Sequence, residues 1–128
     1  MNTLLNHINL ITTDVPALSH FFQAIFHFRV LTVRGKDELT VLEREGFILT
    51  LMLDKTVDGP TYPGIFHIGF LQATRAEVLE LLHQLRAYGL DAPEPKLRSG
   101  NRFGFFVTAP GGILVEIGTM LSATEIAA

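Results

Sequence analysis

Cysteine and tryptophan are absent from the 128-residue sequence, and no apolar run approaches the roughly 20 residues that span a bilayer. Without cysteine there are no disulfide bonds and no thiolate zinc sites, so any metal ligand must be a histidine, a carboxylate or a backbone oxygen. The sequence has no basic stripe and no Lys/Arg-rich amphipathic segment, which argues against nucleic-acid and membrane partners. Residues 1–10 lack a charged region followed by an apolar one, so we expect no secretory signal and a cytoplasmic location.

The composition that remains fits one compact domain. A chain of 128 residues can bury well over half of its unfolded surface, which is enough for a substantial core. Apolar residues make up 48% of the sequence, and ten of its aromatic residues are phenylalanine. We therefore expect a large core with few polar atoms.

Two segments carry helix signals. Asp14 and Pro16 form a start signal, with aspartate as the N-cap and proline in the first turn, and apolar residues then recur at helical spacing as far as His27. The second segment opens with a capping-box pattern at residues 74–77, and Gly89 stands where a left-handed glycine ends a helix. The sequence predicts one helix in each half of the chain.

Strand patterns fill most of the remaining chain. In the first half, β-prone residues cover 4–11, 29–34, 39–44 and 47–53. In the second half they cover 65–71, 103–108 and 113–118, and a short strand is expected somewhere in 92–98. Turn residues at 58–60 and 63–64 mark a joint between the halves.

The two halves also repeat one another. His7 corresponds to His67, and the helix start at Asp14 corresponds to the one at Thr74, each pair being 60 residues apart. Further on, residues 46–50 correspond to 112–116, an offset of 66 that one longer loop explains. Internal repetition of this kind indicates a repeated structural unit.

This repeat predicts an α+β fold of two tandem βαβββ modules within one compact domain. The first module covers residues 1–58, and the second covers 59–128 with a short C-terminal tail. Strand alternation assigns each side chain to one of two faces. In 65–71 and 113–118 one row is wholly apolar, whereas the opposite row carries His67 and Glu116. We predict that the apolar rows pack on the helices, and that a curved mixed sheet forms a cup with the helices outside.

Three residues on the cup-facing rows are candidate metal ligands, namely His7, His67 and Glu116. Two imidazoles and one carboxylate suit Fe²⁺, Mn²⁺, Ni²⁺ or Zn²⁺, and a bound cation would offset the cost of burying the carboxylate. Taken singly, each residue also fits a hydrogen-bonded strand histidine or a solvated glutamate. The repeat places the two histidines in equivalent positions, which favours one divalent-metal site.

Other cup-facing residues are candidates for substrate binding. Asn9 and Thr50 can hydrogen-bond a substrate, and Arg102 can either orient an anionic group or form a surface salt bridge. Met52 and Phe106 would belong to an apolar wall, which also includes Ile48 and Leu114. The sequence does not identify a catalytic acid or base.

Several segments resemble the vicinal-oxygen-chelate superfamily of glyoxalases, bleomycin-resistance proteins and dioxygenases. Residues 5–10, followed by Asp14, resemble the first strand and helix start of that family. Residues 22–30 resemble its aromatic helix end, with His27 where glycine is usual. Residues 109–112 followed by Glu116 resemble its Asp-Pro-x-Gly turn and metal carboxylate, with Ala109 replacing the aspartate.

The resemblance implies paired βαβββ modules, often in a homodimer, with metal ligands at His7, His67 and Glu116. It implies an enzyme that binds a small oxygenated substrate to the metal, as a lyase, an isomerase or a ring-cleaving dioxygenase. Threonine at position 50 is a poor fourth ligand, which argues against glyoxalase I chemistry. The alternative is a metal-free, bleomycin-resistance-like protein that binds a drug or another small molecule. A pseudo-enzyme that keeps the site without the chemistry is a third possibility.

Overall fold

A computed structural model describes residues 1–56 and 62–127, and the chain divides into two compact units. Unit 1 comprises Met1–Pro63 together with Pro110–Gly112, and unit 2 comprises Gly64–Ala109 and Ile113–Ala128. The predicted module boundary, between residues 58 and 59, lies outside the described residues. Among the helices of the described ranges, none is long and apolar enough to cross a membrane.

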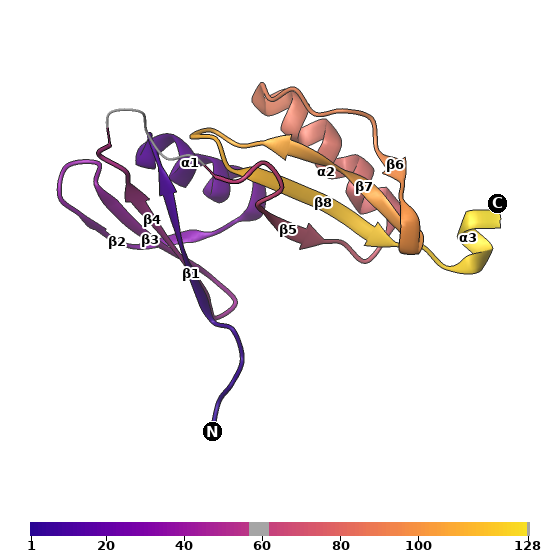
Figure 1. Cartoon of the computed structure of the whole chain (residues 1–128), viewed down its shortest axis with the longest axis horizontal. Helices are drawn as coiled ribbons and strands as arrows, with labels where there is room; N and C mark the ends of the chain where they lie inside the picture. Colours follow the sequence, from indigo (N-terminus) through magenta and orange to yellow (C-terminus); the bar gives the residue numbers. More distant parts are fainter. Residues whose placement is uncertain (57–61, 128) are drawn as a thin grey trace. The chain divides into compact units, whose positions relative to one another are not determined.

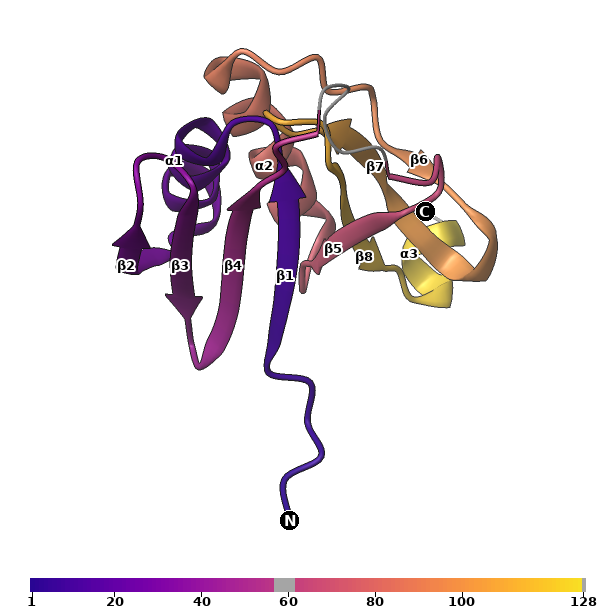
Figure 2. The same ribbon diagram turned by 60° about the vertical axis from the view of Figure 1, so that its left-hand side comes forward.

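Unit 1 contains a complete βαβββ module (Figure 1). Its elements are β1 (His7–Thr12), α1 (Val15–Phe26), β2 (Arg29–Arg34), β3 (Leu39–Arg44) and β4 (Phe47–Leu53). The strands form a four-stranded sheet in the order β1-β4-β3-β2, which Figure 2 shows with its strands side by side. β1 runs parallel to β4, and the other neighbours are antiparallel. Helix α1 packs on this sheet through contacts with β3 and β4.

The ends of α1 follow from its sequence. The Asp14 side chain accepts a hydrogen bond of 3.0 Å from the backbone N–H of Ala17, as expected for an N-cap. At the other end His27 adopts the left-handed conformation, with φ 59° and ψ 31°, and its N–H donates to the carbonyl of Phe22. A non-glycine residue in this conformation costs about 1 kcal/mol, which the buried aromatic stripe of the helix offsets.

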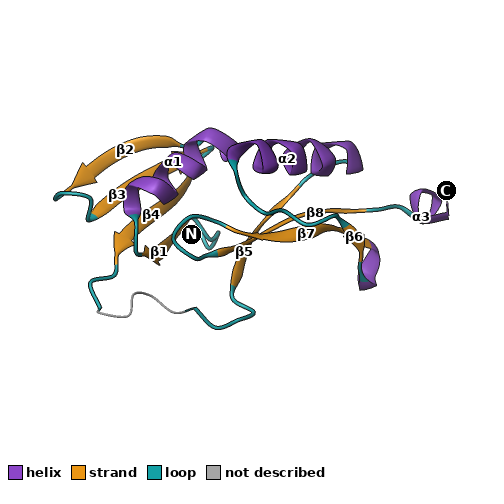
Figure 3. Ribbon diagram, turned by 90° about the horizontal axis from the view of Figure 1, so that it is seen from above, coloured by secondary structure: helices purple, strands orange, loops and turns teal. Residues whose placement is uncertain are grey.

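Unit 2 repeats the same order of elements. It contains β5 (His67–Leu71), α2 (Arg75–Tyr88), β6 (Lys96–Leu97), β7 (Arg102–Thr108) and β8 (Leu114–Met120), with a 3₁₀ turn, η1 (Ser99–Asn101), between β6 and β7. The sheet order is β5-β8-β7-β6, and β5 is parallel to β8. Thr74 caps α2 by accepting from the N–H of Glu77, and Gly89 ends it in the left-handed conformation. Figure 3 shows α2 along one side of the unit 2 sheet.

The strand register shows that the two sheets are equivalent. His7 pairs with Ile48 at the start of β1, just as His67 pairs with Leu114 at the start of β5. The predicted tandem βαβββ fold is therefore confirmed. In the described part of the chain the strands form two four-stranded mixed sheets, β1-β4-β3-β2 and β5-β8-β7-β6, one in each module.

Some boundaries differ from the predicted ones. β1 begins at His7 and not at residue 4, and the apolar side chains of Leu4 and Leu5 are exposed. The short strand expected in 92–98 is β6, which has only two residues. A final short helix, α3 (Ala123–Ala127), was not expected, and within it no described residue is buried. Apolar pattern alone does not predict an exposed helix of this kind.

Unit 2 contains one unusually close approach between strands. Gly104 of β7 is buried and pairs with Gly118 of β8. A Cβ atom added at Gly104 would overlap the carbonyl oxygen of Ile117 and lie 2.7 Å from the Cα of Gly118. A Cβ added at Gly118 would lie 3.1 Å from the Cδ of Arg102. These glycines therefore allow β7 and β8 to approach closely beneath the Arg102 side chain.

In unit 1, a tyrosine hydroxyl covers part of the free edge of β1. The Tyr62 hydroxyl accepts a hydrogen bond of 2.8 Å from the N–H of Ile11 and donates one of 2.6 Å to the Ile11 carbonyl. β1 is the last strand of its sheet, and the Tyr62 hydroxyl satisfies both the N–H and the carbonyl of Ile11. Burial raises the pKa of the Tyr62 hydroxyl, which keeps the proton on the oxygen.

We expect Tyr62→Phe to lower the free energy of unfolding by about 1–3 kcal/mol, because the Ile11 peptide loses both of its hydrogen bonds. Urea titration followed by circular dichroism measures this change. Thr32→Val, which removes an exposed hydroxyl in β2, is the control and should change stability by less than about 0.5 kcal/mol. Equal stabilities for the two variants would show that the Tyr62 contact contributes nothing.

Candidate functional site

The candidate site of unit 2 lies on the sheet face opposite α2. On the face of the sheet that α2 covers, the side chains of β7 and β8 are buried; they include Phe103, Phe105, Val115 and Ile117. Because side chains alternate along a strand, the intervening residues point to the other face. Gly69 and Phe106 are both register partners of Glu116, which places β5, β7 and β8 side by side at this point.

Glu116 is held by an arginine of its own unit. The Arg102 Nη1 donates to both carboxylate oxygens of Glu116, at 3.0 Å to Oε1 and 3.1 Å to Oε2. The Glu116 side chain is only 12% exposed, and that of Arg102 is 34% exposed. The charge of this half-buried carboxylate is therefore already compensated by a protein cation.

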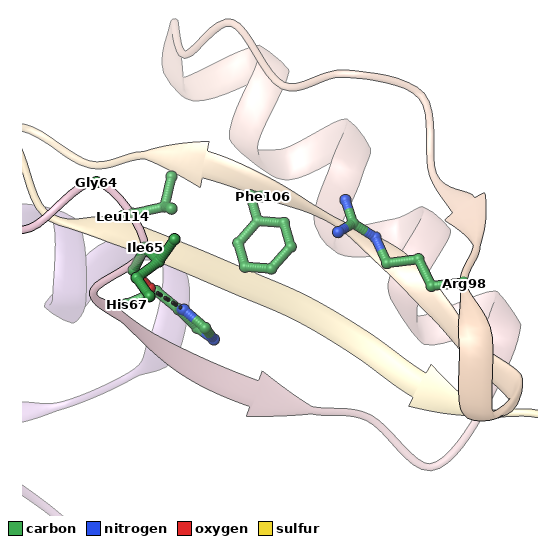
Figure 4. A pocket seen from close by; sticks show the side chains of 6 residues that line it. All are labelled: Gly64, Ile65, His67, Arg98, Phe106 and Leu114. Carbon is green, nitrogen blue, oxygen red and sulfur yellow. Dashed lines mark hydrogen bonds between the residues drawn. The ribbon is translucent and has the colours of Figure 1, made fainter.

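His67 approaches the same carboxylate from β5. Its Nε2 lies 3.7 Å from the Glu116 Oε1. Its Nδ1 lies 2.9 Å from the backbone carbonyl oxygen of Ile65, drawn as a dashed line in Figure 4. A hydrogen bond to a carbonyl requires the proton on Nδ1, so in the neutral ring Nε2 carries the free lone pair. Gly69 leaves room for this meeting, since a Cβ there would lie 3.3 Å from the Glu116 Oε1.

This pair of side chains fits a metal ion. Two ligand atoms bound at about 2.1 Å in a tetrahedral site lie about 3.4 Å apart, close to the 3.7 Å between the His67 Nε2 and the Glu116 Oε1. The hydrogen bond from Nδ1 to a carbonyl is the usual outer support of a metal-binding histidine. Among the described residues, no three His, Asp or Glu side chains of one unit form a complete metal cluster. Unit 2 thus brings together two side chains of the kinds that can bind a metal ion.

A pocket of about 310 Å³ opens beside His67 (Figure 4). Its lining residues are Gly64, Ile65, His67, Arg98, Phe106 and Leu114. The His67 ring stands edge-to-face against Phe106, with ring centroids 5.0 Å apart. The Cζ of Arg98 lies 4.5 Å from the centroid of the same Phe106 ring. The pocket therefore combines apolar walls with an imidazole and a guanidinium, which lie on opposite sides of one phenyl ring in Figure 4.

The remaining predicted residues lie in unit 1. Asn9 pairs with Thr50, and Ile11 pairs with Met52, so these side chains share the face of the sheet that carries His7. His7 is exposed, and its Nδ1 lies 3.0 Å from the Asn6 Oδ1. Their roles in ligand binding stay predictions.

Sequence reasoning identified Phe106 and Leu114 but missed Arg98 and Gly69. Arg98 follows the two-residue strand β6, which was predicted only somewhere within 92–98, so its face could not be assigned. Gly69 has no side chain of its own and acts only by leaving space for a neighbour. Its register with Glu116 could have been read from the repeat, which pairs Asn9 with Thr50 in the same way.

Comparisons with known proteins agree with this architecture. The sequence profile of the Glyoxalase/Bleomycin resistance protein/Dioxygenase superfamily matches residues 4–117. A solved structure described as a possible glyoxalase from Bacillus cereus is 33% identical, covers 91% of this chain and 98% of its own, and superposes with a TM-score of 0.80. No curated protein sequence matches the chain.

Two more distant structures share the fold. The fosfomycin resistance protein FosX from Listeria monocytogenes is 21% identical over 98% of each chain, with a TM-score of 0.77. A lactoylglutathione lyase from Agrobacterium tumefaciens is 16% identical over 92% of this chain and 94% of its own, with a TM-score of 0.72.

Proposed function

We propose, since the chain belongs to the Glyoxalase/Bleomycin resistance protein/Dioxygenase superfamily, that it is a metal-dependent enzyme acting on a small oxygenated substrate. Its divalent ion would be Fe²⁺, Mn²⁺, Ni²⁺ or Zn²⁺, held by His7, His67 and Glu116. The reaction would be a lyase, isomerase or ring-cleaving dioxygenase step at adjacent oxygen atoms.

The proposal depends most on the arrangement at His67. Its Nδ1 donates to the Ile65 carbonyl, and its Nε2 lone pair lies 3.7 Å from a Glu116 oxygen. A histidine that only supports the fold does not require the Glu116 carboxylate beside its Nε2 atom. For the neutral ring, a cation between the Nε2 lone pair and the carboxylate oxygen would make this approach favourable; an imidazolium would instead form an ion pair with Glu116.

His7 is proposed as the third ligand from its equivalent position in unit 1. Like His67, it opens the first strand of its module and has an oxygen beside Nδ1, here the Asn6 Oδ1 at 3.0 Å. The register places Thr50 where unit 2 has Glu116, and threonine is a poor ligand. A site with three protein ligands keeps open positions for substrate oxygens.

Each group would contribute a defined step. A bound ion would act as a Lewis acid and template for the substrate oxygens. The Ile65 carbonyl fixes the tautomer and the orientation of His67. Arg102 holds the Glu116 carboxylate in place, and Phe106 and Leu114 shield one side of the pocket from water. Asn9 and Thr50 would hydrogen-bond a substrate, and Met52 would add apolar contact.

Metal analysis of protein purified without chelator tests the proposal. We expect about one divalent ion per chain in the natural protein, and stoichiometric loss of that ion in His67→Ala. The control is His83→Ala, which removes an exposed histidine of α2 and should leave the metal content unchanged. Equal metal content in the two variants, or none in the natural protein, would contradict the proposal.

A second function is favoured by the Arg102–Glu116 ion pair. Because Arg102 already neutralises Glu116, the carboxylate does not require a metal ion for stability. The chain would then be a binding protein that sequesters a small molecule, as the bleomycin-resistance members of the superfamily are expected to do. Natural protein that stays metal-free after incubation with each of the four ions would favour this second function.

A further inference from the structure

The pocket face of unit 2 carries an excess of positive charge, although the chain as a whole has a formal net charge of −3. Lys96 pairs with Gly104 and therefore shares its face, which is the one opposite the buried Phe103 and Phe105. Arg98 and Arg102 lie on this same face, since Arg98 contacts Phe106 and Arg102 contacts Glu116. Among the charged side chains that the structure places there, three cations face one carboxylate.

Arg98 is the one of these three cations that lines the pocket, and its position is fixed. Arg102 donates to Glu116, whereas the guanidinium of Arg98 has no carboxylate partner in the described part of the chain. The Arg98 backbone is fixed as well, because its N–H donates to the Arg102 carbonyl at 2.6 Å across the turn Ser99–Asn101.

The stacking of Arg98 on Phe106 determines what it can bind. A guanidinium lying over a phenyl ring is held by cation–π attraction, while its N–H groups still point outward in the guanidinium plane. Those N–H groups form a fork that matches the oxygens of a carboxylate or phosphoryl group. Ile65, Phe106 and Leu114 supply apolar contact for the rest of such a ligand.

We infer that Arg98 is the anion-recognition residue of this pocket, and that the ligand is a small organic anion. Its charged oxygens would pair with Arg98, its apolar body would lie against Phe106 and Leu114, and its other end would reach His67. The inference rests on the proposed function only in that this face binds a small molecule, and it does not require the metal ion. It gives Arg98 the anion-binding role that the sequence offered as one of two alternatives for Arg102.

Three probes that share a phenyl ring test the inference on the full-length protein, with binding followed by NMR titration. Benzoate carries a planar anionic head and phenylphosphonate a tetrahedral one, and benzamide is the neutral isostere of benzoate. We expect the natural protein to bind at least one anion about tenfold or more tightly than benzamide, as a charge-assisted hydrogen-bonded pair implies. The tighter-binding anion identifies the head group.

The decisive variant is Arg98→Gln, which should bring the affinity for that anion down to the affinity for benzamide. Arg98→Lys keeps the charge without the planar fork and should retain part of the preference. Arg34→Gln, which removes an exposed arginine at the end of β2, is the control and should keep the full preference. Because Arg98 is exposed, the amide spectrum of Arg98→Gln should otherwise match that of the natural protein.

The titrations are run both as purified and after chelation, which separates this inference from the metal proposal. If the chelated protein still prefers the anion and Arg98→Gln does not, Arg98 is confirmed whether or not a metal was present. If metal is bound through His67 but the chelated protein binds benzoate, phenylphosphonate and benzamide equally, the inference is wrong and the proposed function stands. An anion preference that survives in Arg98→Gln likewise overturns it.

Discussion

Replacing Gly104 with alanine is expected to lower the free energy of unfolding by at least about 3 kcal/mol. This is the upper end of the usual cost of forcing an extra methyl group into a packed interior. The added Cβ would meet the carbonyl oxygen of Ile117 and the Cα of Gly118, which are backbone atoms and cannot rotate away. Relief requires β7 and β8 to separate, and that would break the hydrogen bonds between them. Urea titration followed by circular dichroism measures the change.

Gly64→Ala is the matched control. Gly64 belongs to the same unit, and a Cβ added there meets nothing within 4 Å. The control should change stability by less than about 1 kcal/mol, in either direction. If both variants unfold at the same urea concentration, the close approach of β7 and β8 does not constrain the sheet.

Replacing Glu116 with glutamine is expected to weaken metal binding by more than about 100-fold. This exceeds the usual effect of removing a residue that only supports a metal ligand, because Glu116 would bind the ion itself. The amide keeps the shape of the side chain but removes the negative charge that a divalent ion needs. Competition with a chromogenic chelator measures the affinity. Glu45→Gln, which alters an exposed glutamate in a turn of unit 1, should leave it unchanged.

The same variant distinguishes the two proposed functions. In a metal-free binding protein, Glu116→Gln would leave metal content at zero and lower stability by about 1–3 kcal/mol, because Arg102 loses the charged partner of a half-buried ion pair. Unchanged affinity in a protein that does bind metal would mean that the ion is held elsewhere. That result would contradict Glu116 as a ligand.

The fold could be predicted from sequence because its signals are local and occur twice. Caps at Asp14 and Thr74 and the alternating strands set the elements, and the equivalent histidines set the repeat. The superfamily resemblance is confirmed by the match over residues 4–117. Strand alternation also predicts that His67 and Glu116 share a face, since both lie on the row of side chains that does not pack on the helix.

The sequence offered a salt bridge as one role of Arg102, but it did not identify Glu116 as the partner. Arg102 and Arg98 lie four residues apart around a turn, and both face the pocket side of the sheet. Which arginine pairs with Glu116 depends on the backbone of the turn, where Gly100 and Asn101 both have positive φ. The Gly104–Gly118 approach is equally invisible, because a glycine in a strand pattern does not reveal what lies against it.

The shared register also bears on how such a chain can evolve. Thr50 and Glu116 occupy matching positions in two duplicated halves, on the sheet face that α1 and α2 leave uncovered. A mutation at either position would change the chemistry of one half without disturbing its hydrophobic interior. A single substitution at such a position is therefore enough to give one half an acidic group and leave the other neutral, so the two halves can differ in chemistry while they keep the same fold.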